Sequence, residues 1–142
     1  QGPVTADERI TICHGAPFDE DFYLFDEFDA RLAFDHFAQP IGFYGHTHVS
    51  TVFRRTRTAL DLLNRTTREC TVQIEPDAAY LINPGSVGQP RDNDPRAAYA
   101  LYDTGTARLD LIRVPYQIAL TQQKMTEAGL PAPLIRRLES GR

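Results

Sequence analysis

The feature that most constrains this chain is the motif Gly45-His46-Thr47-His48, which directly follows an apolar run at residues 41–44. In an extended segment, side chains two residues apart point to the same side, so the rings of His46 and His48 would converge on one spot. Neutral imidazole is the most frequent nitrogen ligand for zinc, iron and nickel ions in proteins. Such pairs also occur in strands that bind nothing, so the motif alone leaves a metal site and an ordinary strand end both open.

Two further stretches have the same layout. Residues 9–13 form a strand-like run that leads directly into His14, and residues 80–82 form another that ends at Asn83. The sequence therefore predicts three short strands, each followed by a glycine-containing loop, and two of these loops carry histidine. Loops gathered at one end of a sheet are where metal and active sites are usually built, so this layout favours a metal centre.

These three motifs occur together in one known family. They are His14-Gly15, then Gly45-His46-Thr47-His48, then Asn83-Pro84-Gly85-Ser86-Val87-Gly88-Gln89-Pro90. From about Ile10 to its end, the chain resembles the C-terminal half of a calcineurin-like metallophosphoesterase. It is most similar to small bacterial members described as diadenosine-tetraphosphatase-like or serine/threonine-phosphatase-like. The resemblance implies an α/β fold: half of an αββα sandwich, in which two mixed sheets pack face to face and helices cover their outer faces.

The resemblance also implies an enzyme, a metal-dependent phosphatase or phosphodiesterase. In such enzymes two divalent ions activate a water molecule that attacks the phosphate ester. By resemblance, His14 and His46 would ligate one ion and His48 the other, and the ions could be manganese, iron, zinc, nickel or cobalt. The residues expected to support the ligand loops are Gly45, Thr47, Asn83 and Ser86.

The family's remaining ligands come from Asp-x-His, Gly-Asp and Gly-Asn-His motifs, and none of these occurs in the 142 residues. Three neutral imidazoles cannot balance the four positive charges of two divalent ions. We therefore expect residues 1–142 to form one domain, the C-terminal part of a metallophosphoesterase domain with an incomplete active site. No catalytic residue is assigned, and the isolated chain is expected to be inactive or weakly active.

Two functions of other classes remain open. Some proteins with this fold, such as the retromer scaffold subunit, are non-catalytic scaffolds that bind other proteins. A simple metal sensor could use His14, His46 and His48 around a single zinc ion with one open position. A scaffold should tolerate the loss of His46, and a sensor should hold one ion per chain.

Arginines near the motifs are candidates for substrate contact. Arg54 lies in a basic cluster just after His48, where it either protects an exposed strand edge or holds a phosphate oxygen. Arg91 and Arg96 flank an acidic stretch, residues 92–95, that we interpret as a surface loop. All three could pair with phosphate oxygens through two parallel hydrogen bonds.

The segments between the motifs give weaker signals. Phe25, Phe28, Leu32 and Phe37 approximate helical spacing, and Asp26 is a candidate N-cap. This acidic and aromatic segment is either an amphipathic helix with a solvated face or a rim of the cleft that selects substrate. Cys13 is expected in the core. Towards the C-terminus we predict an inner strand at 97–103, its hairpin partner at 107–114, and helices at 116–128 and 133–138.

Composition restricts the partners. A formal charge of −4 and a pI near 5.5 argue against general nucleic-acid binding. No apolar run approaches the ~20 residues that span a bilayer, and two cysteines are too few for a disulfide framework, which favours the cytoplasm. The expected partner is a phosphate-ester substrate. A half-sandwich would also expose an apolar sheet face, through which the protein could self-associate.

Overall fold

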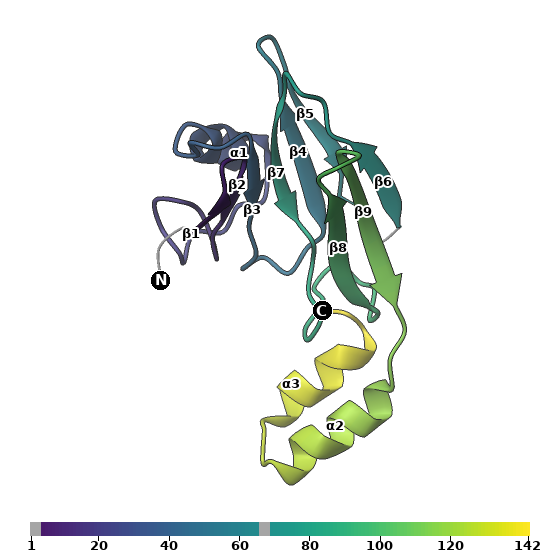
Figure 1. The fold of residues 1–142 in the computed structure, drawn as a ribbon. Helices are drawn as coiled ribbons and strands as arrows, with labels where there is room; N and C mark the ends of the chain where they lie inside the picture. Colours follow the sequence, from purple (N-terminus) through teal and green to yellow (C-terminus); the bar gives the residue numbers. More distant parts are fainter. Residues whose placement is uncertain (1–3, 66–68) are drawn as a thin grey trace.

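The computed structural model describes residues 4–65 and 69–142, which form two β-sheets and four short helical segments (Figure 1). The larger sheet has the strand order β1-β2-β3-β7-β4-β5 and the smaller sheet the order β6-β9-β8. The strands are β1 (Val4–Asp7), β2 (Ile10–Ile12), β3 (Ile41–Phe43), β4 (Thr51–Arg55), β5 (Leu60–Asn64), β6 (Cys70–Gln73), β7 (Ala79–Asn83), β8 (Ala97–Asp103) and β9 (Arg108–Val114).

Three parallel strands at the centre of the larger sheet, β2, β3 and β7, end at the same edge. Ile12, Phe43 and Ile82 lie side by side in the register. Since parallel strands run in one direction, the loops that follow them leave the sheet together. The prediction that three strands deliver three loops to one place is confirmed.

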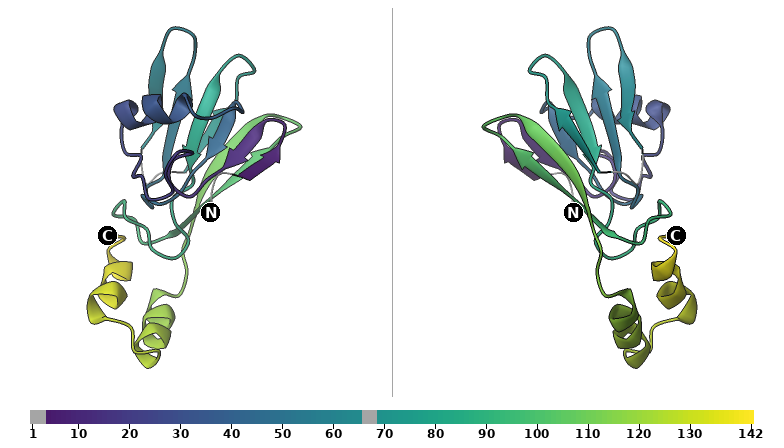
Figure 2. Two further views of the ribbon diagram at one scale, coloured as in Figure 1. Left: turned by 90° about the vertical axis from the view of Figure 1, so that its left-hand side faces the viewer. Right: turned by 90° about the vertical axis from the view of Figure 1, so that its right-hand side faces the viewer.

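The two sheets pack against each other through a shared apolar core (Figure 2). The fully buried Tyr80 and Ile82 of β7 contribute from the larger sheet, while Leu109 and Leu111 of β9 contribute from the smaller one. In a strand, side chains two residues apart share a face, so β7 and β9 each direct one alternate set into this layer. Helices and two sheets therefore form the layered α/β architecture that the sequence predicts, but only the larger sheet is mixed, because both strand pairs of the smaller sheet are antiparallel.

Helix α1 (Glu27–Phe34) covers the opposite face of the larger sheet. Asp26 caps it as expected, accepting hydrogen bonds from the backbone of Phe28 and Asp29 in a capping box. Most of the expected apolar stripe, however, faces solvent, with Phe28 77% exposed, and only Phe37, beyond the helix end, packs against the core. Ala30, Ala33 and Phe34 are buried instead. The small alanines let the helix lie close to the sheet, so spacing correctly predicted the helix but not its buried face.

Strand β8 is an edge strand, not the inner strand that the sequence suggested. Its Ala98 and Ala100 face the core, but Leu101 on its other face is 56% exposed. The central strand of the smaller sheet is β9, which pairs with β8 on one side and β6 on the other. Apolar residues on both faces of β8 therefore did not mean that both faces are buried. The predicted β8–β9 hairpin itself is confirmed.

The C-terminal segment forms a helical hairpin of α2 (Ile118–Glu127) and α3 (Ala132–Arg136), followed by a 3₁₀ turn, η1 (Arg137–Glu139). Gly129 ends α2 with φ +71°, as the sequence predicts. The hairpin extends away from the sheets, and the chain end returns to the loop after β7 (Figure 1), where Asn93 N donates to Gly141 O at 2.9 Å. No helix within residues 4–65 and 69–142 is long and apolar enough to cross a membrane.

Candidate metal centre

Backbone hydrogen bonds hold the His14 loop against the His46 loop. Pairing continues past the strand ends, with Cys13 N donating to Phe43 O at 3.0 Å and Gly45 N donating to His14 O at 2.8 Å. A Cβ atom on residue 45 would meet His14 O at 3.4 Å, an ordinary van der Waals contact, so this approach of the two loops does not by itself require glycine. The two histidine-bearing loops are therefore fixed side by side by their main chains.

The segment from His46 to His48 is not extended, so the expectation that strand geometry would bring the two rings together is wrong. His46 and His48 have φ angles of +62° and +59°, in the left-handed region, and Thr47 N turns back to Gly45 O at 2.7 Å. Strand alternation therefore does not apply to this motif. Instead, the tight loop directs His46 towards His14, and His48 towards the loop after β7.

His14 and His46 form a close imidazole pair. His46 Nδ1 lies 3.0 Å from His14 Nε2, and the rings meet at 70° with centroids 4.8 Å apart. Two nitrogens that each lie about 2.0–2.1 Å from one ion are about 2.9–3.4 Å apart for bond angles between 90° and the tetrahedral value. The observed separation is that of a hydrogen bond between the two rings, and it also lies within the range for two ligands of a single ion. His46 Nε2 is buried and makes no hydrogen bond to any described residue.

His48 is held in one tautomer. Its Nδ1 lies 2.8 Å from Gln89 O, and because a carbonyl oxygen only accepts, Nδ1 carries the hydrogen. The lone pair is then on Nε2. Burial lowers the pKa of His48, the hydrogen bond to Gln89 opposes this, and the charge of Arg91 lowers it further. His48 is thus favoured in the neutral form, which a metal ligand requires.

Asn83 joins the loops after β3 and β7. It is fully buried, and its Nδ2 donates to Gly45 O and Thr47 Oγ1, both at 2.9 Å. Its Oδ1 accepts from Gly85 N at 2.9 Å, and Ser86 Oγ accepts from Gln89 N at 2.9 Å. These contacts place Asn83 and Ser86 beneath the histidine loops, where they set the loop geometry.

We expect Asn83→Ala to lower the free energy of unfolding by about 2–3 kcal/mol, because it leaves the buried Thr47 Oγ1 and the partly buried Gly45 O and Gly85 N without their partner. Chemical denaturation measures the loss. The matched control is Gln73→Ala, which removes an exposed amide that donates to Thr106 O and Ala107 O. Its effect should stay within about 0.5 kcal/mol, as is usual for surface positions. Equal effects at the two positions would contradict the supporting role of Asn83.

Comparisons with known proteins identify the family. The family model for the calcineurin-like phosphoesterase superfamily domain matches residues 3–107. The chain belongs to this superfamily. It is similar to a metallophosphoesterase from Sphaerobacter thermophilus, with 37% identity and a TM-score of 0.89, covering 100% of this chain and 58% of that one. The mixed α/β fold expected from the resemblance is therefore confirmed.

Two archaeal proteins are also similar to this phosphoesterase-family chain. MJ0912, an uncharacterized protein of Methanocaldococcus jannaschii, is 36% identical over 100 residues, which are 70% of this chain and 39% of that protein. The hypothetical protein PH1004 of Pyrococcus horikoshii OT3 shares the fold, with a TM-score of 0.65 at 15% identity over 94% of this chain and 46% of that one. The chain thus spans well under two thirds of the length of these relatives.

Of the three candidate arginines, only Arg91 lies at the histidine loops. Its backbone N donates to His48 O at 3.2 Å, and its side chain donates to Gln89 Oε1 at 2.9 Å. Its Nε is buried and makes no hydrogen bond to the part of the chain that the structure describes. Arg54 lies towards the opposite end of β4, in salt bridges to Asp61 and Glu75.

Arg96 pairs with Asp94 in the loop between β7 and β8. The acidic stretch that contains Asp94 is not the exposed surface loop that we expected. Asp94 is only 8% exposed, and the side chain of Asp92 is 7% exposed where it pairs with Arg113 of β9. Both carboxylates have a nearby guanidinium partner, which explains how they can be buried.

Sequence reasoning missed three contributors to the site. Gln89 fixes His48 through its backbone carbonyl, which no side-chain motif can reveal. Tyr23 places its ring 4.0 Å from that of His46, and the buried Arg113 reaches the loop after β7 from the other sheet. Cys13 is in the core as expected, where burial raises the pKa of its thiol to about 11.

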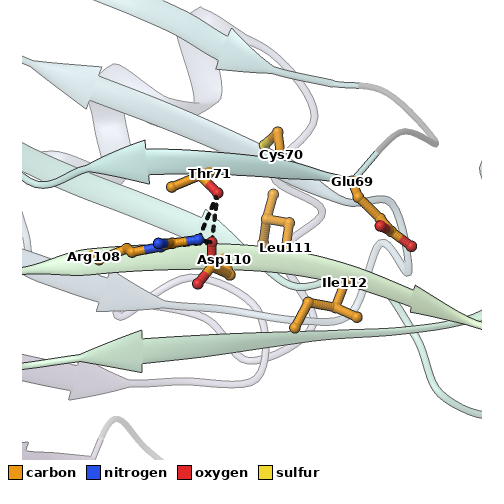
Figure 3. Close-up of a pocket in the computed structure, with 7 residues that line it drawn as sticks. All are labelled: Glu69, Cys70, Thr71, Arg108, Asp110, Leu111 and Ile112. Atoms are coloured by element: carbon orange, nitrogen blue, oxygen red, sulfur yellow. Dashed lines mark hydrogen bonds and ion pairs between the residues drawn. The ribbon is translucent and has the colours of Figure 1, made fainter.

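The described residues do not complete a metal centre by themselves. Within 4–65 and 69–142, no group of three or more His, Cys, Asp or Glu side chains is arranged to hold a metal ion. A separate pocket beside β6 and β9 contains Thr71, Arg108 and Asp110 (Figure 3). Arg108 and Thr71 both bond to Asp110 there, so these polar groups are already paired with one another.

Proposed function

We propose that the protein is a metal-dependent phosphoesterase in which this chain supplies the histidine part of a dinuclear active site. Family membership and fold support phosphoesterase chemistry in general. The observation that carries the dinuclear proposal is the pair of imidazole nitrogens 3.0 Å apart at His14 and His46, next to a separate, tautomer-fixed His48. One pair and one single ligand are what two adjacent ions would require from these loops.

In this proposal His14 and His46 bind one ion and His48 binds the other. The ions would polarise the phosphate and lower the pKa of a bound water. Neutral imidazoles accept manganese, iron, zinc, nickel or cobalt, so the donor set does not select one metal. Arg91, which lies at the same loops, would contact the phosphate of the substrate, since guanidinium matches phosphate oxygens.

The carboxylates that such a centre needs would come from polypeptide outside residues 1–142. Three neutral ligands leave the charge of two divalent ions uncompensated, and acidic ligands normally supply that compensation. We therefore propose that residues 1–142 are the C-terminal part of the catalytic domain and are weakly active alone. Both cysteines are free, which fits the reducing cytoplasm that we propose as the location.

The test compares the chain with a longer protein in which the segment proposed to carry the missing carboxylates is joined to it, both purified without chelator. We expect about two metal equivalents and hydrolysis of bis(4-nitrophenyl) phosphate or 4-nitrophenyl phosphate in the longer protein. Residues 1–142 should hold close to none. A sample stripped of metal and reloaded with manganese controls for loss during purification. A longer protein that binds two ions but hydrolyses neither ester would favour the scaffold, and a single ion would favour the sensor.

A further inference from the structure

Two exposed aromatic rings stack on each other beside the candidate metal centre. Tyr23 and Phe25 are 45% and 41% exposed, and their rings are stacked with an interplanar angle of 7° and centroids 5.5 Å apart. Single exposed aromatic residues are common on protein surfaces. Two exposed aromatic rings that stack on each other are less usual there. We call this pair the aromatic platform.

The platform touches a proposed metal ligand directly. The ring of Tyr23 lies 4.0 Å from the ring of His46, centroid to centroid, at an angle of 43°. A group bound to the platform would therefore lie next to a phosphate held at His14 and His46. The platform and the proposed centre form one continuous surface, made by the loop after β2 and the loop after β3.

The backbone holds the platform rigidly. Leu24, between the two rings, is only 1% exposed and belongs to the core beneath α1. Phe25 N donates to Asp29 Oδ2 at 2.9 Å, which ties the platform to the first turn of α1. On the other side, Gly15 lies so close to the backbone of Glu20 and Phe22 that a Cβ atom there would clash at 2.5 Å. The rings are thus preorganised.

The charges around the platform restrict what it can bind. Asp19, Glu20, Asp21 and Asp26 are all exposed in the same segment. Their negative charge opposes binding of a further phosphate or carboxylate on this side. The group that fits is planar, aromatic and not anionic, because such a ring can make edge contacts with the exposed parts of Tyr23 and Phe25, whose rings already stack on each other and of which Tyr23 also contacts His46.

We propose that the aromatic platform is a substrate subsite that binds a planar aromatic group carried by the alcohol part of the phosphate ester. This rests on the proposed phosphoesterase function and adds a specificity to it. The ring could belong to an aryl-type alcohol or to a nucleobase, because both present a flat π-face. The residues that confer the preference are Tyr23 and Phe25, and they act by binding and not by chemistry.

The test uses two matched pairs of esters and the longest protein that carries this chain. Benzyl phosphate and cyclohexylmethyl phosphate have similar size and leaving groups but differ in aromaticity. Adenosine 5′-phosphate and ribose 5-phosphate form the second pair, which detects a nucleobase. We expect kcat/KM for one aromatic member to exceed its partner's by about five- to ten-fold, as stacking commonly gives. Tyr23→Leu and Phe25→Leu should each bring that ratio close to one.

Phe28→Leu is the control, because Phe28 is an exposed aromatic residue in the adjoining helix that is not part of the platform. It should leave both ratios unchanged. A second readout needs no turnover: benzylphosphonate should bind the protein about five-fold more tightly than cyclohexylmethylphosphonate, and Tyr23→Leu should abolish the difference. Equal rates and equal binding within both pairs would overturn the subsite while the phosphoesterase function stands. Absence of hydrolysis with preferential benzylphosphonate binding would overturn the function and leave the subsite.

Discussion

Replacing Arg113 with methionine is expected to lower the free energy of unfolding by about 3–5 kcal/mol, the cost of leaving one member of a buried ion pair alone. The side chains of Arg113 and Asp92 are 3% and 7% exposed, and two guanidinium nitrogens bond to the two carboxylate oxygens. Without Arg113, the carboxylate of Asp92 would remain buried and uncompensated. Denaturant titration followed by circular dichroism measures the change.

The matched control is Arg108→Met, because Arg108 lies on the same strand and pairs with Asp110 in an exposed position. Exposed ion pairs contribute little, so this variant should lose less than about 1 kcal/mol. The double variant Asp92→Leu/Arg113→Met removes both charges, and we expect it to recover much of the loss. If Arg113→Met were no more harmful than Arg108→Met, the pair would not be the structural link that its burial indicates.

This ion pair also connects the smaller sheet to the histidine loops. Asp92 Oδ2 accepts from Ser50 N at 3.5 Å, and the neighbouring Arg91 N donates to His48 O at 3.2 Å. Arg113 therefore holds the loop that fixes the position of His48. The expected consequence of Arg113→Met is a looser His48 loop as well as a less stable domain, since supporting contacts orient the ligands.

The strands and loops of the site could be predicted because their signals are local. Apolar runs that end in glycine or asparagine place β2, β3 and β7, and parallel pairing brings their loops to one edge. Capping by Asp26 and the stop at Gly129 are also local and are confirmed. Each of these features depends on residues within a few positions of one another.

The features that could not be predicted depend on contacts between distant segments. Arg113 meets Asp92 across 21 positions, and Tyr23 meets His46 across 23, so no periodicity indicates either contact. The left-handed conformations of His46 and His48 are imposed by the packing of three loops, and β-strand reasoning failed there for that reason. The exposure of Phe28 similarly depends on how closely α1 approaches the sheet.

His46→Gly is expected to remove the metal bound by the His14–His46 pair and to reduce phosphoesterase activity by at least about 100-fold. Loss of a residue that only supports a metal ligand commonly costs 10–100-fold, and loss of the ligand itself should cost no less. Metal content by elemental analysis and hydrolysis of 4-nitrophenyl phosphate, both in the longest protein that carries this chain, measure the two effects.

Glycine is the informative replacement because the backbone of His46 has a φ of +62°. Glycine adopts this conformation without strain. Alanine would add backbone strain to the loss of the imidazole, so the two effects could not be separated. Ala107→Gly is the control, since Ala107 also has a positive φ, +52°, and lies in the remote β8–β9 hairpin. Both variants should keep the unfolding free energy within about 1 kcal/mol, so a selective loss of metal and activity in His46→Gly would report on the imidazole. Unchanged hydrolysis there would instead mean that the ester is cleaved without the ring that pairs with His14, which would overturn the proposed role of His46 as a metal ligand.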